Sequence, residues 1–286
     1  MNALMIALVA VLFLPVAAMS QEAKATLFEG KVTIIRGTVA MQGVEGMLMR
    51  PGDIVENPGS GIAQIELSGS TIVVLGPATR AYFPKLSGTA TDAFLLSGWL
   101  KSETTAKSGA SRFSSSLLSA APKDATLVCH AAPSTSEIFV ESGSAGVAEP
   151  GSPPKPATAG QFISRKAGKT VRQPQPDSDF LGSMPVPFRD TFPSRWSRFQ
   201  GSKPPEPKRD HEVSYEEIQS WLTLPIWRRG FAERFQSRAK DPAFRRAIES
   251  HLAELPDWDR ILHPEKYNTG PAPASNDHPS TKQGEY

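Results

Sequence analysis

Apolar and polar residues alternate over short stretches in the first half of the chain. In the segment AQIEL, which begins at Ala63, the apolar residues fall on one face and Gln64 and Glu66 on the other, as in a half-buried strand. After a Ser-Gly-Ser turn, residues 71–75 (TIVVL) form a more continuously apolar segment, so the pair predicts a β-hairpin. No stretch between residues 27 and 101 keeps a helical apolar period for three turns, which favours an all-β region.

Short β-branched segments separated by Gly and Pro continue this pattern. Further strands are expected at residues 31–36, 38–41, 78–83, 93–101, 125–129, 137–140, 146–148, 161–163 and 170–171. Residues 102–121 are rich in Ser, Thr and Ala, and we expect a crossing loop there. The Gly-Ser-Pro-Pro-Lys-Pro insert at 151–156 is expected to be an exposed loop. The predicted fold is mainly β, with an all-β domain of short strands over residues 21–171 that forms a sandwich or β-roll.

Prolines gather in the segment that follows. Eight of them fall among residues 172–210, and because proline lacks a main-chain donor, residues 172–212 are predicted to be an extended linker. The middle of this linker carries four aromatic residues, Phe188, Phe192, Trp196 and Phe199. We expect this cluster to dock on a neighbouring domain, with a partner-binding segment as the alternative.

Residues 213–267 have a helical apolar period and predict a small unit of three helices. Ser214, followed by Glu217 three residues later, is a capping box that starts the first helix. Apolar residues four apart predict a second helix over 226–239, and Asp241 followed by proline supplies the N-cap of a third. Three helices this short bury too little apolar surface to be stable alone, so we expect them to pack on the β domain or on a partner.

The two ends of the chain are predicted to lie outside these domains. Residues 1–20 contain an apolar run without any charged side chain, too short to span a bilayer comfortably, and they are typical of a signal peptide. Cleavage is expected after Ser20, with Ala18 as the alternative. The protein is therefore expected in the periplasm, or at the inner membrane if the run is an uncleaved anchor. Residues 268–286 are rich in Pro, Ser, Asn and Gly, and are expected to be disordered.

Charge and cysteine content narrow the range of partners. The chain carries 31 basic and 29 acidic residues, and neither half has a basic excess that would hold nucleic acid by bulk charge. The chain is therefore expected to bind no nucleic acid. The single cysteine, Cys129, cannot form an internal disulfide.

The search for catalytic motifs predicts no enzyme. Cys129 and His130 look like a nucleophile and its base, but adjacent residues on a strand point to opposite faces. The chain has no phosphate-binding loop, no Gly-x-Ser-x-Gly elbow and no cysteine pair for zinc, and its five histidines lack ligand spacing. We expect no catalytic residues, no metal and no small-molecule cofactor.

Two sets of residues are candidates for binding. Arg228, Arg229 and Arg234 concentrate positive charge on the second predicted helix; the simplest interpretation is a solvated face with ion pairs, and an anionic partner is the alternative. Trp99 and Trp196 are candidates for a stacking surface that would bind peptidoglycan or another envelope glycan. Short strands rich in Gly and Ser also offer edges to a partner strand.

Several segments in a fixed order resemble the periplasmic FecR domain. They are the run GKVTIIRG from Gly30, the Gly52-Asp53 turn, the hairpin over 63–77, the segment LLSGWL from Leu95, and the closing elements Glu141-Ser142-Gly143 and Ala159-Gly160-Gln161. The resemblance covers about residues 30–170 and implies a non-enzymatic β domain. The best-known members are transmembrane regulators that receive a signal from an outer-membrane receptor and control a sigma factor. We expect no counterpart of the family's cytoplasmic anti-sigma segment here.

These observations together predict an exported FecR-like domain, followed by the linker and the helical unit. Its expected role is that of a protein-interaction or scaffold module of the cell envelope, with an envelope protein as the partner. One alternative is a component of envelope signal transduction that works with a separate membrane anti-sigma protein. The other is a module that binds peptidoglycan or another glycan.

Overall fold

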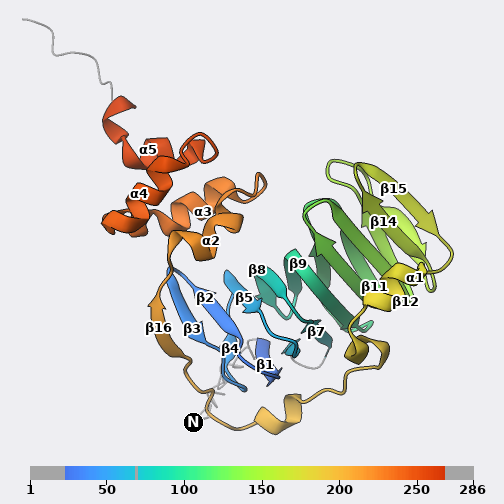
Figure 1. Ribbon diagram of the computed structural model, residues 1–286. Coiled ribbons are helices and arrows are strands. Elements are labelled where there is room, and N and C mark those ends of the chain that lie inside the picture. Colours follow the sequence, from blue (N-terminus) through green and yellow to red (C-terminus); the bar gives the residue numbers. More distant parts are fainter. Residues whose placement is uncertain (1–22, 68–69, 268–286) are drawn as a thin grey trace, which may run out of the picture.

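A computed structural model describes residues 23–67 and 70–267 of the chain. The described part is mainly β: sixteen strands join in one hydrogen-bonded network, and a few small helices follow near the C-terminal end (Figure 1). This confirms the predicted fold class. The predicted signal peptide (1–20) and disordered tail (268–286) lie outside the described residues.

The strands follow one another along most of the chain. Their bounds are β1 Ala23–Phe28, β2 Thr33–Arg36, β3 Val39–Gln42, β4 Leu48–Met49, β5 Asp53–Asn57, β6 Ala63–Leu67, β7 Thr71–Leu75, β8 Thr79–Ser87, β9 Ala90–Thr104, β10 Ala110–Ser114, β11 Ser119–Ala132, β12 Thr135–Ala148, β13 Lys155–Thr158, β14 Phe162–Lys166, β15 Lys169–Gln173 and β16 Lys208–Glu212. The α-helices are α1 Ser178–Ser183, α2 Tyr215–Leu222, α3 Arg228–Phe235, α4 Pro242–Ser250 and α5 Asp259–Leu262. Short 3-10 helices lie at Val186–Arg189, Trp196–Phe199, Gln236–Lys240, Pro256–Trp258 and Pro264–Lys266.

Three long strands, β9, β11 and β12, divide the network into two packed layers because each of them belongs to both. Layer 1 has the order β16-β3-β2-β5-β8-β9-β10-β11-β12-β13 and uses the first half of β9 and of β11 and the second half of β12. Layer 2 has the order β4-β1-β6-β7-β9-β11-β12-β14-β15 and uses the other halves. The fold is therefore a sandwich whose two layers are continuous through shared strands.

Each shared strand contains one residue with a positive φ near the point where it changes layer. These residues are Gly98 in β9 (φ +90°), Asp124 in β11 (φ +48°) and Gly143 in β12 (φ +70°). A Cβ on Gly143 would lie 1.9 Å from the carbonyl oxygen of Asp124. Glycine at 143 thus permits both the left-handed backbone and the close approach of β11 to β12.

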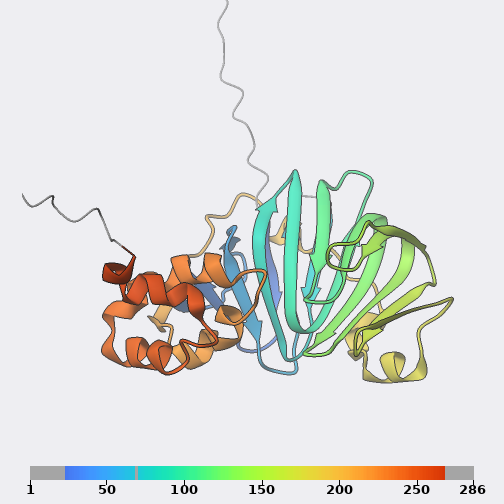
Figure 2. The same cartoon turned by 90° about the horizontal axis from the view of Figure 1, so that it is seen from above.

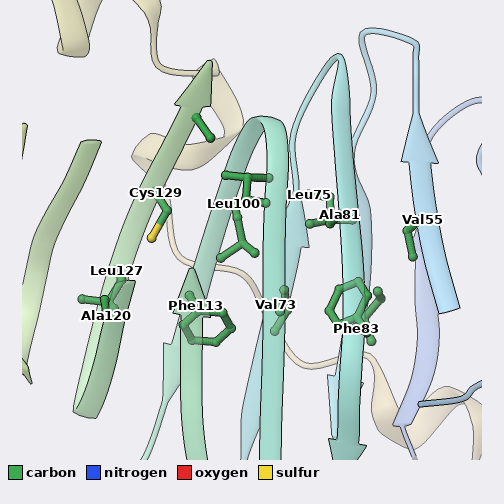
Figure 3. Close-up of a cluster of buried hydrophobic side chains, with 14 of the residues drawn as sticks. Val55, Val73, Leu75, Ala81, Phe83, Leu100, Phe113, Ala120, Leu127 and Cys129 are labelled. Carbon is green, nitrogen blue, oxygen red and sulfur yellow. The ribbon is translucent and has the colours of Figure 1, made fainter. Parts of the chain in front are cut away.

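The space between the layers is filled by apolar side chains from both. Figure 3 shows part of this core, including Phe83 and Phe113 of layer 1 and Val73 and Leu100 of layer 2. The predicted hairpin forms as β6 and β7, with Ala63 paired to Leu75 and Leu67 to Thr71. Cys129 points into the same core, and burial raises the pKa of its thiol to about 12.

The crossing loop expected over residues 102–121 is replaced largely by strands. This stretch contains the end of β9, all of β10 and the start of β11, and β10 pairs parallel with β9 and antiparallel with β11. Of its three large apolar residues, Phe113 and Leu118 are buried in the core and Leu117 is half-buried. Small Ser and Ala side chains surround them and conceal the alternation. The insert at 151–156 is exposed, as predicted, although its last two residues begin β13.

The C-terminal third of the chain wraps around the sandwich. Residues 174–207, which we call the strap, run along the outer face of layer 2 and contain α1 and two 3-10 helices (Figure 1). Strand β16 then pairs with β3 at the edge of layer 1. Residues 213–267, the helical unit, cover part of the outer face of layer 1 at one end of the molecule (Figure 2).

The starts of the helices follow the predicted signals. Ser214 caps α2, and Glu217 completes the capping box. The second helix is shorter than predicted, because α3 ends at Phe235 and passes into a 3-10 turn. Asp241 caps α4 by accepting a hydrogen bond from the main-chain N–H of Ala243 at 2.8 Å.

Candidate interaction surfaces

A row of polar side chains crosses the outer face of layer 2 beneath the strap. It consists of Lys24 on β1, Gln64 and Glu66 on β6, and Lys101 and Glu103 on β9. The alternation in β6 predicted that Gln64 and Glu66 would lie on the solvent side of a half-buried strand. Both are instead buried, because the strap covers the second face of this strand.

Lys101 is the most completely enclosed charge in this row, with 1% of its surface exposed. Its Nζ donates hydrogen bonds to the carbonyl oxygens of Phe188 (2.8 Å) and Asp190 (2.9 Å). The ammonium group also forms an ion pair with Glu141 at 2.7 Å. A buried ammonium requires such a full set of acceptors, so Lys101 fixes the position of the strap at two main-chain atoms.

Glu66 also binds the strap, but as a hydrogen-bond acceptor. It accepts hydrogen bonds from the main-chain N–H of Arg195 (2.7 Å) and the hydroxyl of Ser194 (2.6 Å) on the strap. Its carboxylate also accepts from Thr26 (2.7 Å) and from the amide of Gln64 (2.8 Å). These two sheet residues orient the carboxylate, which therefore meets the strap in a fixed geometry.

The remaining side chains of the row also bind main-chain atoms of the strap. Gln64 donates to the carbonyl oxygen of Pro193 (3.0 Å), and Glu103 accepts from the main-chain N–H of Phe192 (2.9 Å). Lys24 lies 3.5 Å from the carbonyl oxygen of Phe199. Among the described residues, no hydrogen bond joins the main chain of the strap to the main chain of either layer. Side chains of the sheet hold the main chain of the strap instead.

Aromatic side chains anchor the strap between these polar contacts. Phe188 is fully buried and Phe192 is 9% exposed, which confirms docking on the β domain for these two members of the predicted cluster, while Trp196 and Phe199 are half-buried. Phe180, outside that cluster, is also fully buried. Phe180 packs against Phe162, with ring centroids 4.8 Å apart, and against Trp99 at 5.2 Å.

The two tryptophans proposed as a glycan-binding surface lie under or within this cover. Trp99 is 8% exposed and its ring stacks on His130 at 4.3 Å, so the expected open stacking platform is absent at Trp99. Trp196 is half-buried, with Nζ of Lys24 4.8 Å from its ring centroid. The two rings therefore have different neighbours, and no ring contact joins them in the described part of the chain.

A small charge cluster lies beside Trp99. Nδ1 of His130 is 2.8 Å from one carboxylate oxygen of Glu137, and Nζ of Lys166 is 2.8 Å from the other. Burial raises the pKa of the Glu137 carboxyl, but the hydrogen bonds from His130 and Lys166 outweigh it, and the pKa lies below its usual range. Cys129 faces the core while His130 packs with Trp99 on the outer face, so the two do not form a nucleophile and base.

The three candidate arginines occupy different environments. Arg234 donates to three main-chain carbonyl oxygens, those of Gly37 (2.9 Å), Gly52 (2.7 Å) and Ile35 (3.0 Å). Burial lowers the pKa of this guanidinium. Arg234 therefore clamps α3 to strand β2 and to the loops at Gly37 and Gly52 of layer 1.

The other two arginines lie nearer to solvent and have acidic partners. Arg228 pairs with Asp257, and Arg229, which is 83% exposed, pairs with Glu233 one turn away at 3.2 Å. Arg229 fits the simple interpretation of a solvated helix face with ion pairs. The three side chains do not form one anion-binding patch.

An open groove borders the helical unit on the outer face of layer 1. The loop between α2 and α3 reaches over β8 and β9 (Figure 1). Beside it lies a hollow of about 260 Å³, lined by Ile226 and Trp227 of the loop, by Pro84, Pro150 and Leu118, and by polar residues that include Asp92 and Arg112. Ile226 is 70% exposed, the most of any large apolar side chain identified as exposed in the described part. Trp227 also lines a second hollow, of about 340 Å³, next to Arg234.

The sequence pattern did not identify this groove. An isoleucine beside a tryptophan in an inter-helix loop was its only local signal, and Arg112 comes from a strand more than a hundred residues earlier. Arg112 is exposed, and none of the described residues forms an ion pair with it. Asp92, its neighbour across β9 and β10, also lines the groove and pairs with Lys85 at 3.5 Å. The groove therefore combines apolar side chains with an exposed arginine and a carboxylate that already has a partner.

Two end strands also present edges. β15 pairs only with β14, and β16 only with β3. Both are charged, with Lys169 and Arg172 on β15 and Lys208, Arg209 and Asp210 on β16. Charges on an edge oppose the addition of another strand, so the edges fit a partner strand less well than the groove fits a side chain.

Within the described part of the chain, no group of three or more His, Cys, Asp or Glu side chains could hold a metal ion. None of the helices in the same residues has the length and apolar character needed to cross a membrane.

Comparison with solved structures yields a distant likeness. No family model and no curated protein matches the sequence. Two crystal structures of a "putative anti-sigma factor" from Parabacteroides distasonis, at 2.50 and 1.65 Å resolution, resemble this chain with a TM-score of 0.39 and 12% identity. Each match covers 45% of this chain and 62% of the other, so less than two thirds of that protein is spanned.

Proposed function

We propose that this protein is a non-enzymatic interaction module of the cell envelope and that it binds a partner protein through the groove at Ile226. The exposed Ile226 side chain next to an apolar hollow carries the proposal. Large apolar side chains that project beside a hollow are typical of protein-binding sites. Arg112 at the same groove adds a preference for a partner segment that is both apolar and acidic.

The location in the envelope rests on the sequence of residues 1–20, and the FecR-like character of residues 30–170 is part of the proposal. The order of the FecR-like segments supports it, since the Gly52-Asp53 turn, the β6–β7 hairpin and the segment from Leu95 lie on strands of one sandwich. A glycan-binding role is less well supported, because Trp99 is covered by the strap.

Site-specific photo-crosslinking in cells tests the groove. A photoreactive amino acid replaces Ile226 in the full-length chain, and products are identified by mass spectrometry. Val44, which is 37% exposed on a different loop, serves as the matched control position. We expect one envelope protein to be crosslinked from position 226 and not from 44, and the additional substitution Arg112→Glu to reduce its yield.

The products decide between the alternatives. Equal or absent crosslinking at the two positions contradicts the proposal. A membrane anti-sigma protein as the captured partner would favour the role in envelope signal transduction. The N-terminus of the mature protein, read by mass spectrometry from the soluble periplasmic fraction, is expected at Gln21. An intact Met1 in the inner membrane would favour the anchor instead.

A further inference from the structure

We propose that the outer face of layer 2 is a peptide-binding face, that residues 185–199 of the strap are its resident ligand, and that it accepts in trans an extended segment of a partner with the same chemistry. This chemistry consists of two aromatic residues four positions apart with a proline directly after the second, as in Phe188, Phe192 and Pro193. The inference concerns a different face from the groove at Ile226 and does not depend on it.

The first argument is the type of atom that the face recognises. Five side chains of the sheet contact six main-chain atoms of the strap: the carbonyl oxygens of Phe188, Asp190, Pro193 and Phe199 and the N–H groups of Phe192 and Arg195. Contacts to main-chain atoms tolerate many sequences, as in other modes of peptide recognition. The side chain of Ser194 also contacts this row, through its hydroxyl hydrogen bond to Glu66.

The second argument is that the strap can leave without disrupting a sheet. Its main-chain hydrogen bonds are local, for example Phe188 N–H to the carbonyl of Pro185 (2.9 Å) and Arg198 N–H to that of Arg195 (3.1 Å). Every hydrogen bond between strap and sheet involves a side chain, and departure breaks no pairing between strands. The face left behind would carry charged groups that water can solvate, next to apolar residues such as Ile62, Val74 and Trp99 that only an aromatic ligand covers.

The third argument concerns the anchors that select the ligand. Phe188 is fully buried and stands edge-on to Phe192, with centroids 5.9 Å apart. Space for it depends on Gly76, where a Cβ would lie 3.3 Å from both Phe188 and Pro185. Lys101 lies between the anchors, with its Nζ 5.9 Å from the ring centroid of Phe192. The face therefore requires aromatic side chains at two defined points.

Because the strap is part of the same chain, it competes strongly with any partner segment for the layer 2 face. It is joined to β15 at one end and to β16 at the other, so its effective concentration at the face is high. A partner segment binds in trans only if one connection is relaxed or if the segment binds more tightly. Cutting the strap at one end should therefore open the face without altering any residue in it.

The experiment introduces a protease site at the exposed turn around Gly201, beyond Phe199, the last strap residue that is hydrogen-bonded to the polar row, in the full-length protein. A fluorescent peptide of residues 184–200 is then titrated before and after cleavage, with anisotropy as the measurement. We expect the cleaved protein to bind at least about tenfold more tightly than the intact one. A peptide with both Phe188→Ala and Phe192→Ala should not bind, and Lys101→Met in the protein should abolish binding.

A matched control places the same protease site at Gly151, in the exposed loop before β13. Cleavage there should leave peptide affinity unchanged. Hydrogen exchange of the intact protein supplies a second test. The N–H groups of Phe192 and Arg195 should exchange faster than the β6 and β9 amides beneath them. The proposal is overturned if cleaved, folded protein fails to bind the peptide, or if strap amides exchange only with global unfolding.

Discussion

The two outer faces of the sandwich are covered in different ways. On layer 1, apolar residues such as Ile54 and Phe94 meet the aromatic core of the helical unit, which includes Trp221 and Phe235. On layer 2, charged and amide side chains hold the main chain of an extended strap, and aromatic anchors fill the gaps. The first contact requires particular side chains over a wide area, whereas the second requires a polypeptide in the correct conformation with aromatic side chains at two points. The helical unit is therefore expected to be a permanent part of the fold, and the strap an exchangeable one.

The largest effect is expected from Trp221→Ala in the helical unit. Trp221 is fully buried and packs edge-on against Phe231, with centroids 5.8 Å apart. Its removal leaves a large cavity, and the free energy of unfolding should fall by about 3–5 kcal/mol, measured by urea denaturation. Fluorescence and circular dichroism should report one shared transition. Separate transitions for the helices and the strands would show that the helical unit is not integral to the sandwich.

Lys101→Met should have the next largest effect, and its effect should be confined to the strap. The variant loses the hydrogen bonds to Phe188 and Asp190, while Glu141, 32% exposed, turns to water. The strap should be destabilised by about 2–3 kcal/mol, seen as faster hydrogen exchange and cleavage by protease within residues 185–199. Protection of α2 and α3 should not change. An equal loss of protection on both faces would remove the distinction between them.

Arg234→Lys tests the hydrogen bonds by which the helical unit is held on layer 1. Lysine cannot reproduce the fork that bonds three carbonyl oxygens, so a loss of about 1–2 kcal/mol in unfolding free energy is expected. Arg229→Lys is the control, because this exposed residue has one exposed partner and should change stability by about 0.5 kcal/mol or less. Similar values for the two variants would contradict the clamp assigned to Arg234.

The smallest effect is a pH dependence at the cluster under Trp99. The pKa of Glu137 is lower in the folded state than its ordinary value, so the stabilisation is present above the ordinary carboxyl pKa of about 4.3 and is lost as pH falls through the folded value. Glu137→Gln should flatten the fall in stability below this pH, measured by denaturation at pH 3 to 6. An unchanged slope would show that other carboxylates control acid unfolding.

Local patterns predicted the elements that depend on neighbouring residues. The hairpin of β6 and β7 and the capping box of Ser214 and Glu217 formed as predicted, because both are determined within a few positions. Alternation in β6 also identified its two faces correctly. It could not show that Gln64 would be buried, since its partner Pro193 lies 129 residues later.

The groove could not be predicted for the same reason. Ile226 and Arg112 meet only after the helical unit has docked on layer 1, and neither residue belongs to a pattern that indicates the other. Strand β10 was missed because small residues surround Phe113, so the apolar period is too weak to recognise.

The order of the elements along the chain has a consequence for biosynthesis. Strands β1 to β15 precede the segments that cover them, so a chain that folds from its N-terminal end can form most of its sandwich while both outer faces are bare. The layer 2 face then presents Glu66 and Lys101, which water hydrates well, but also Ile62, Val74 and Trp99. The layer 1 face presents Ile35, Ile54 and Phe94. Both faces therefore expose apolar surface at first, and layer 1 stays open longer because the helical unit comes after the strap in the chain.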